Sequence, residues 1–553
     1  MPKLRLFSLT PTAKVFPDEP VRESELCSYF EGFQNETISF QIAFQGITEL
    51  DRRPVYLETV SPLSAWIRIR TVLTVPVRLA TLPNADDNYL RKTPGLYPDL
   101  LRDQQRDDPL AALRVQTGQW QSFWLDVETE GCCEPGKYPI EILLKDTENE
   151  NVLATISVSV AILPGMLPPQ KLIRTHWFHA DCLAEYYHVP VFSEEHWAII
   201  EKFIRTTVRR GCNMILTPLF TPPLDTAPGG ERLTVQLVDV TVHDGEYSFG
   251  FERMERWVEV CRRCGVSYLE MAHLFTQWGA KATPKIMGTV DGAEKRLFGW
   301  ETDAHGEEYA RFLREFLPAL MDELKRLGVA DRVYFHISDE PSLEHLEDYR
   351  HACSLVKPYI QGRPVIDALS DFAFYQTGAL QKPVVAIDHL EPFLQAEVSG
   401  LWTYYCVGQY RDVTNAFIAM PAARTRILGV QLYLFQLEGF LQWGYNFYHT
   451  ELSRRQINPY ETTDAGGVFP SGDPFQVYPG PDGNPEESLR FMNLHLAMQD
   501  LRALEALETL RGREHVLQLL NECAQGLLTL TEYPREAAFF EKLRRRVNEE
   551  LTT

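Results

Sequence analysis

Apolar and polar residues alternate through much of the first third of the chain, which is the pattern of strands with one buried face. In residues 38–44 every second side chain is Ile or Phe, which predicts a half-buried strand. Further strands are expected at 124–127, 140–144 and 155–162. A Pro-Gly pair at 135–136 can supply a turn between antiparallel neighbours. Short strands separated by turn clusters predict a β-sandwich over residues 1–165, and the prolines between Pro164 and Pro169 mark its end.

From residue 166 the pattern changes to strands alternating with helices. Ser193 and Gly211 bound one expected helix, Gly265 ends a second, and a third has an apolar stripe ending at Gly328. Pro318 inside this third helix predicts a kink or a later start. A long loop or small β insertion precedes the second helix. Eight strands are expected, at residues 172–177, 213–217, 267–273, 332–337, 364–367, 384–388, 401–406 and 440–447.

Eight strands separated mostly by helices predict a (β/α)8 TIM-type barrel over residues 166–485. The remainder, residues 486–553, is helical and charged, and we expect it to pack on the barrel as a C-terminal helical appendage. The expected fold is therefore multidomain, with a β part followed by an α/β part.

Charge narrows the classes of function. The 553 residues carry 76 acidic and 54 basic side chains, a formal charge of -22. Such a surface repels phosphate backbones and anionic lipid, which argues against nucleic-acid and membrane partners. The N-terminal sequence lacks the apolar stretch of a signal peptide, and the ten cysteines are scattered. A reduced, cytoplasmic protein is expected. A homodimer is compatible with exposed sandwich strands, although no residue pattern demands one.

No metal or cofactor site is predicted. Cys261 and Cys264 form a C-x-x-C, but it lies in a helical pattern and no second pair has the spacing of a zinc site.

The segment His336-Ile337-Ser338-Asp339-Glu340-Pro341 ends the fourth barrel strand. Barrel enzymes place catalytic groups where strands end at the carboxyl face, so Asp339 and Glu340 are the candidate catalytic pair. The structural alternative is that the two acids begin a solvated loop or cap the next helix, but Ser342 already fits the cap role.

Paired carboxyl groups suit the hydrolysis of glycosidic bonds, which usually requires one protonated and one ionised acid. Like charges side by side raise one pKa, and a raised pKa would let Glu340 hold a proton near neutrality. Barrel glycosidases with Asn-Glu-Pro on the fourth strand take a nucleophile from the seventh. Here the motif is Asp-Glu-Pro, and residues 401–409 contain no acid. This favours attack by a 2-acetamido oxygen of the substrate itself.

These six residues resemble the active-site segment of family 123 glycoside hydrolases. Similar features continue at 298–300, 443–446, 477–480 and 488–490, so the resemblance spans roughly residues 170–505. It implies an exo-acting β-N-acetylgalactosaminidase that works by substrate-assisted retention without a cofactor. By position, Asp339 would stabilise the oxazolinium and Glu340 would be the acid/base.

Other strand ends offer sugar contacts: His176, Trp177, His273, Trp278, Asp367, Asp388, Tyr404, Trp443 and Asn446. Tyr404 could orient the acetamido carbonyl. Two alternatives remain open. A retaining enzyme for a sugar without the acetamido group would use Asp388 or Glu391 as nucleophile, and a non-catalytic glycan-binding protein would need neither.

Overall fold

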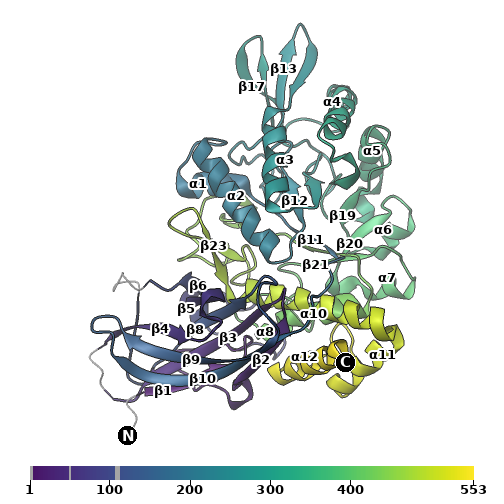
Figure 1. Ribbon diagram of the computed structural model, residues 1–553. Coiled ribbons are helices and arrows are strands. Elements are labelled where there is room, and N and C mark those ends of the chain that lie inside the picture. Colours follow the sequence, from purple (N-terminus) through teal and green to yellow (C-terminus); the bar gives the residue numbers. More distant parts are fainter. Residues whose placement is uncertain (1–3, 49–51, 106–111) are drawn as a thin grey trace.

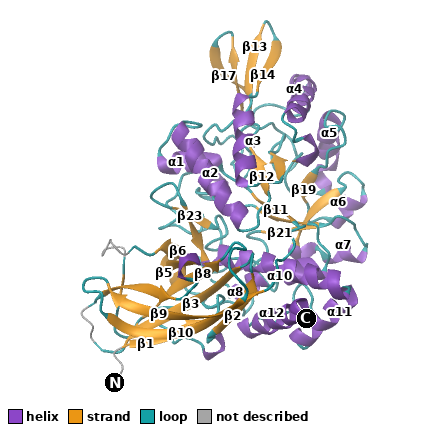
Figure 2. Cartoon of the chain, in the orientation of Figure 1, coloured by secondary structure: helices purple, strands orange, loops and turns teal. Residues whose placement is uncertain are grey.

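The computed structural model describes residues 4–48, 52–105 and 112–553 and consists of three parts. Strands of the N-terminal part pack as two layers, a ring of strands and helices lies beside them, and three long helices close the chain (Figures 1 and 2). Residues 1–3 of the expected strand-like start lie outside the described residues. No helix in the described part of the chain is long and apolar enough to cross a membrane.

Two sheets form the N-terminal part. The larger has the order β1-β3-β8-β5-β6-β24-β23 and the smaller β2-β10-β9-β4-β7. Their facing apolar side chains, such as Phe40, Phe123 and Ile142, make one core. The larger sheet contains β1 (Leu4–Leu9), β3 (Thr37–Gly46), β8 (Trp120–Glu128), β5 (Ile67–Val77), β6 (Gly95–Asp103), β24 (Pro485–Ser488) and β23 (Val477–Pro479). The smaller contains β2 (Tyr29–Phe33), β10 (Val152–Leu163), β9 (Gly136–Asp146), β4 (Pro54–Val60) and β7 (Leu113–Arg114).

Three details of this part differ from the sequence prediction. Strand β3 is not half-buried, because its polar face is covered as well: Gln41 donates to the carbonyl of Ala13, and the Gln499 side-chain oxygen accepts from the Thr37 amide. The Pro-Gly turn does not join antiparallel neighbours, because β8 and β9 belong to different sheets. Strands β23 and β24, which follow the barrel in sequence, pair with the N-terminal sheet. The boundaries at residues 165 and 485 stay predictions.

All eight expected barrel strands are present and parallel. Their order is β18-β15-β12-β11-β22-β21-β20-β19, and the Phe335 amide donates to the Pro364 carbonyl at 2.9 Å across the remaining gap, so the sheet nearly closes. The strands are β11 (Ile173–His176), β12 (Met214–Thr217), β15 (Tyr268–Met271), β18 (Val333–Phe335), β19 (Ile366–Ala368), β20 (Lys382–Ala386), β21 (Trp402–Tyr405) and β22 (Gly439–Gln442). A nearly closed, eight-stranded parallel barrel with helices is thus confirmed.

Helices follow most of these strands: α1 (Ala180–Tyr187), α2 (Glu194–Arg209), α3 (Glu252–Cys264), α4 (Glu307–Arg326), α5 (Leu346–Val356), α6 (Phe372–Gln376), α7 (Glu391–Gln395), α8 (Ala422–Arg426) and α9 (Leu428–Leu434). Helix α4 begins well before Pro318 and runs through it, so a later start is wrong; burial of its apolar stripe outweighs the lost hydrogen bond. The expected insertion before α3 is the hairpin of β13 (Asp239–His243) and β14 (Glu246–Gly250). It joins β16 (Ile286–Val290) and β17 (Ala293–Phe298), which follow β15 and were not predicted, in a four-stranded sheet that projects from the barrel (Figure 1).

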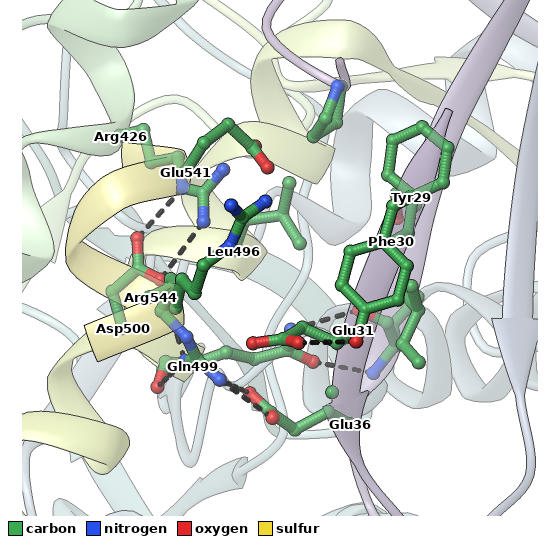
Figure 3. Close-up of a pocket in the computed structure, with 16 residues that line it drawn as sticks. Tyr29, Phe30, Glu31, Glu36, Arg426, Leu496, Gln499, Asp500, Glu541 and Arg544 are labelled. Atoms are coloured by element: carbon green, nitrogen blue, oxygen red, sulfur yellow. Dashed lines mark hydrogen bonds and ion pairs between the residues drawn. The ribbon is translucent and has the colours of Figure 1, made fainter. Parts of the chain in front are cut away.

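The C-terminal helices α10 (Leu489–Arg511), α11 (Arg513–Ala524) and α12 (Ala537–Thr552) form the expected appendage. Helix α10 packs on α9 and on strand β6, so it contacts both the barrel and the sandwich. Where α12 meets the sandwich, Arg544 binds both carboxylate oxygens of Glu36, at 2.9 and 2.8 Å, beside the bidentate Arg426–Asp500 pair (Figure 3).

Replacing Arg544 with Ala should destabilise the protein by about 2–4 kcal/mol, because the Glu36 side chain is only 2% exposed and would keep an unpaired charge. Arg545→Ala is the matched control, since this exposed neighbour on the same helix makes no ion pair with a described residue. Chemical denaturation monitored by fluorescence would measure the difference. Equal losses in the two variants would contradict the importance of the pair.

Candidate active site

A cavity of about 300 Å³ opens at the carboxyl ends of the barrel strands. Its walls come from strands on all sides of the barrel and from the loops that follow them, which is where barrel enzymes carry their chemistry. Acids and aromatic rings dominate the lining: Trp177, His179, Leu224, Asp225, Gln277, Trp278, Asp339, Glu340, Ala368, Tyr404, Cys406, Val407, Leu441, Trp443, Glu451, Leu452 and Phe469.

Asp339 and Glu340 lie together on this wall, and neighbouring groups fix their backbone. The Asp339 carbonyl accepts from the Trp278 amide at 3.0 Å, and Ser338 donates to the Thr276 carbonyl at 2.9 Å. Glu340 has φ +47, a left-handed conformation that non-glycine residues adopt at a cost. Tyr404, at the end of β21, donates its hydroxyl to Glu340 Oε1 at 2.5 Å. The strain and the tyrosine together aim the Glu340 carboxylate into the cavity.

The pKa of Asp339 is raised well above its usual value by burial and by the charge of Glu340. His336 opposes this shift. The sequence prediction placed a raised pKa on Glu340; in the structure, burial raises the pKa of its neighbour Asp339. Two adjacent acids in one pocket share protons, so near neutrality the pair is favoured to retain one.

Beneath the pair, His336 is clamped between two carboxylates. Its Nε2 lies 2.6 Å from Glu270 on β15, and its Nδ1 lies 3.0 Å from Asp367 on β19. Burial alone would lower the pKa of His336, but the hydrogen bonds and charges of Asp367 and Glu270 raise it to about 9. The imidazole is therefore a cation at neutral pH, and both its N–H groups donate.

The same carboxylates hold the pocket wall. Glu270 accepts from Trp177 Nε1 at 2.8 Å and from Thr175, so an indole that lines the cavity is fixed by the group that binds His336. Trp443 Nε1 donates to Asp473 at 3.3 Å. Trp278 is 43% exposed and forms part of the rim. Such rings can stack on sugar faces.

Four of the nine predicted contact residues line the cavity, namely Trp177, Trp278, Tyr404 and Trp443. Asp388 does not, because it bonds Gln409 at 2.9 Å and His389 outside the cavity; Glu391, the other candidate nucleophile, is also outside it.

Four other predicted residues are buried behind the wall. His176 points away from the barrel axis toward Arg174, and burial lowers its pKa far below the usual value. His273 stacks on His336 with ring centroids 4.1 Å apart, and Asp367 binds that same ring. Asn446 bonds the backbone of His179 at 3.0 Å and so supports a residue that does line the cavity. These four support the site without lining it.

Sequence reasoning missed His179, Asp225, Gln277 and Glu451. Asp225 lies in a loop and Glu451 begins a single 3-10 turn, Glu451–Ser453; Asp225 accepts from the Leu452 amide at 3.1 Å, which joins the two segments. Burial raises the pKa of Asp225 to about 6. Only the position of His179 just beyond the first strand could have signalled a role, since loop acids carry no periodic pattern.

Two groups of described side chains bring potential metal ligands within 4.8 Å of one another: Asp181, Cys182 and His449, and His273, His336 and Asp367. Protein partners already occupy most of these atoms. Arg232 binds both oxygens of Asp181, and both nitrogens of His336 are bonded to carboxylates.

Comparison with known proteins identifies a family and a related fold. The model of the glycoside hydrolase 123 catalytic domain matches residues 177–507. A family 123 glycoside hydrolase from Clostridium perfringens matches in structure with a TM-score of 0.71 at 14% identity, covering 100% of this chain and 97% of that one. A Bacteroides uniformis β-glucuronidase matches with a TM-score of 0.31 at 12% identity, covering 90% and 49%. No curated protein matches.

A carboxyl-lined pocket at the end of the barrel, together with the match to a glycoside hydrolase model, identifies the protein as a glycosidase. The chain belongs to family 123 of the glycoside hydrolases, because the family's catalytic-domain model covers more than half of its length.

Asp473 behind Trp443 gives a test of this electrostatic environment. Burial raises the pKa of Asp473 to about 8, so between about pH 4 and pH 8 the folded state keeps a proton that the unfolded chain releases. The contribution of this group to stability is complete below about pH 4 and is lost as pH rises to about 8, by up to about 1.4 kcal/mol per pH unit. Asp473→Asn should therefore gain stability relative to the parent across this range. Denaturation curves at several pH values measure it, and a difference independent of pH would refute the buried proton.

Proposed function

We propose that the protein is an exo-acting, retaining β-N-acetylgalactosaminidase in which the substrate's 2-acetamido group is the nucleophile. Asp339 accepts the acetamido N–H and stabilises the oxazolinium, while Glu340 first protonates the leaving oxygen and then activates water. The observation that carries the proposal is the placement of the adjacent acids Asp339 and Glu340 on the wall of one pocket, where burial raises the pKa of Asp339.

Substrate binding determines which of the two acids, Asp339 or Glu340, carries the proton. In the free pocket, burial and the charge of Glu340 favour the protonated form of Asp339. An acetamido N–H that donates to Asp339 favours its ionised form instead, because a hydrogen bond to a carboxylate stabilises the charge. The His336 cation acts in the same direction. The proton of the pair is then left to Glu340, beside the glycosidic oxygen, where general acid catalysis requires it.

Tyr404 supports this mechanism from the opposite wall. Its strand, β21, ends without an acid, and its hydroxyl reaches Glu340 in the free pocket. A bound acetamido carbonyl would compete for this donor and be oriented for attack on the anomeric carbon. Asp388 and Glu391, the nucleophiles of the alternative mechanism, lie outside the cavity.

The natural substrate class is proposed from the same pocket. The Clostridium perfringens relative is described as hydrolysing the glycans of glycolipids. For this chain we infer a β-linked N-acetylgalactosamine at the end of such a glycan or of a fragment of it, and we place the reaction in the cytoplasm. A cavity of about 300 Å³ suits one sugar unit.

Variants of the acid pair should differ in their dependence on the leaving group. Glu340→Gln should lower kcat/KM by about 10²–10⁴-fold on a phenyl β-N-acetylgalactosaminide and much less on a dinitrophenyl one, which leaves without a proton. Asp339→Asn should impair both substrates alike, because it acts on the acetamido group.

Asp388→Asn and Glu391→Gln are the matched controls, as they remove acids outside the cavity and should retain nearly full activity. Equal sensitivity of the two pair variants to the leaving group would exclude the assigned roles. A large loss in either control would revive the alternative nucleophile.

Changing the substrate tests the nucleophile directly. Replacing the 2-acetamido group by hydroxyl should reduce kcat/KM by more than about 10³-fold, since effective molarities of attached groups are large. The thiazoline analogue of the cyclic intermediate should inhibit competitively. If Asp225 or Glu451 were the nucleophile, the galactoside would be hydrolysed well, and Asp225→Asn or Glu451→Gln would abolish that turnover. If the parent protein hydrolysed no aryl glycoside, the glycan-binding alternative would be favoured.

A further inference from the structure

A second cavity, of about 630 Å³, lies beside the active-site cavity, and one loop contributes to both. Glu451 and Leu452 line the active site, whereas Ser453, Arg454, Arg455 and Gln456 line the second cavity. Its volume falls within the range of ~300–1,000 Å³ common for small-ligand sites.

Hydrogen bonds and an unusual backbone conformation hold the wall between the two cavities. Ser453 donates to the Asp225 carbonyl at 2.7 Å, and Arg232, which lines the second cavity, bonds His179 of the first at 3.1 Å. Leu452 and Ser453 both have left-handed backbones, with φ +55 and +53. Two consecutive strained non-glycine residues persist only where surrounding contacts hold them, and such strain concentrates at functional sites.

The second cavity carries positive charge that the protein does not neutralise. Its acids already have partners: Glu185 binds His449 at 2.5 Å, and Glu231 binds Lys285 at 3.0 Å and also Arg296. Among the described residues, the exposed guanidinium groups of Arg454 and Arg455 have no ion pair. The excess is notable in a chain with a net charge of -22.

We propose that this second cavity is a subsite for the carboxylate or sulfate of an acidic sugar unit next to the cleaved residue. Arg454 and Arg455 bind the anion, and the strained loop fixes their position relative to Glu451 and Leu452 in the active site. Guanidinium forks suit both oxyanions. The inference rests on the proposed function, because it assigns a second recognition element to the same glycan.

A matched pair of substrates tests the subsite. One is a β-N-acetylgalactosaminyl galactose whose galactose carries a sulfate ester, and the other is the same disaccharide without sulfate. In Arg454→Gln/Arg455→Gln, KM for the sulfated substrate should rise about tenfold, while KM for the neutral one and for an aryl β-N-acetylgalactosaminide stays unchanged. Arg5→Gln/Arg511→Gln is the control, since it removes two exposed arginines without ion pairs to described residues and changes the net charge equally.

Inhibition by inorganic sulfate tests whether the second cavity binds the sulfate group itself. Inorganic sulfate should inhibit turnover of the sulfated disaccharide by the parent enzyme but not of the neutral one, and the double variant should lose this sensitivity. Equal KM values for the two disaccharides in the parent, or the same KM change in the control double variant, would overturn the subsite. Absence of turnover of the aryl glycoside would instead count against the proposed function, so the two failures are distinct.

Discussion

The candidate active site depends on the ion pairs that the buried His336 imidazolium makes with two carboxylates. It bridges Glu270 and Asp367, so one cation ties β18 to its neighbour β15 and to β19 across the gap in the barrel. Removing one partner of a buried ion pair leaves an uncompensated charge, which costs several kcal/mol. His273, stacked on the cation, has a pKa lowered by burial and by His336, and it remains neutral.

The contacts of His336 also fix the backbone that carries the candidate catalytic pair, Asp339 and Glu340. Asp367 accepts from the Ile337 amide at 3.1 Å as well as from His336, so it fixes the backbone between the end of β18 and Asp339. Tyr349 of α5 donates to the other Asp367 oxygen at 2.6 Å. A helix on the outside of the barrel is thereby connected to the acids on its inside, and the left-handed turn at Glu340 is held from both sides.

Strand ends could be predicted from the sequence, but the side to which each residue points could not be resolved with equal accuracy. His176 and Trp177 are adjacent at the end of β11, yet the indole faces the cavity and the imidazole faces the outer shell. Where a strand ends, the alternation that would tell the two apart ends too. Asp225 and Glu451 were out of reach for another reason, because loops that meet in space leave no pattern in either segment.

The polar face of β3 shows the same limit in the sandwich. Alternation in residues 38–44 located the strand, but it says nothing about what covers the polar side. The neighbouring strands carry buried charges: Arg70 of β5 binds Asp126 of β8 and Glu487 of β24, and Arg210 at the end of α2 binds Glu487 as well. Because buried ion pairs need closely matched geometry, they fix how the barrel sits on the sheet.

The charge of the pocket favours the proposed chemistry. Four carboxyl groups, Asp225, Asp339, Glu340 and Glu451, line it, while the nearby His336 and Arg232 cations are already matched by their own carboxylate partners. Burial raises the pKa values of Asp225 and Asp339, and the negative field of the neighbouring carboxylates raises them further. The same field stabilises positive charge on a substrate, and a glycosidic bond that breaks leaves positive charge at the anomeric carbon. Retention of a proton by the acid pair and the proposed stabilisation of an oxazolinium would thus be two consequences of one electrostatic arrangement.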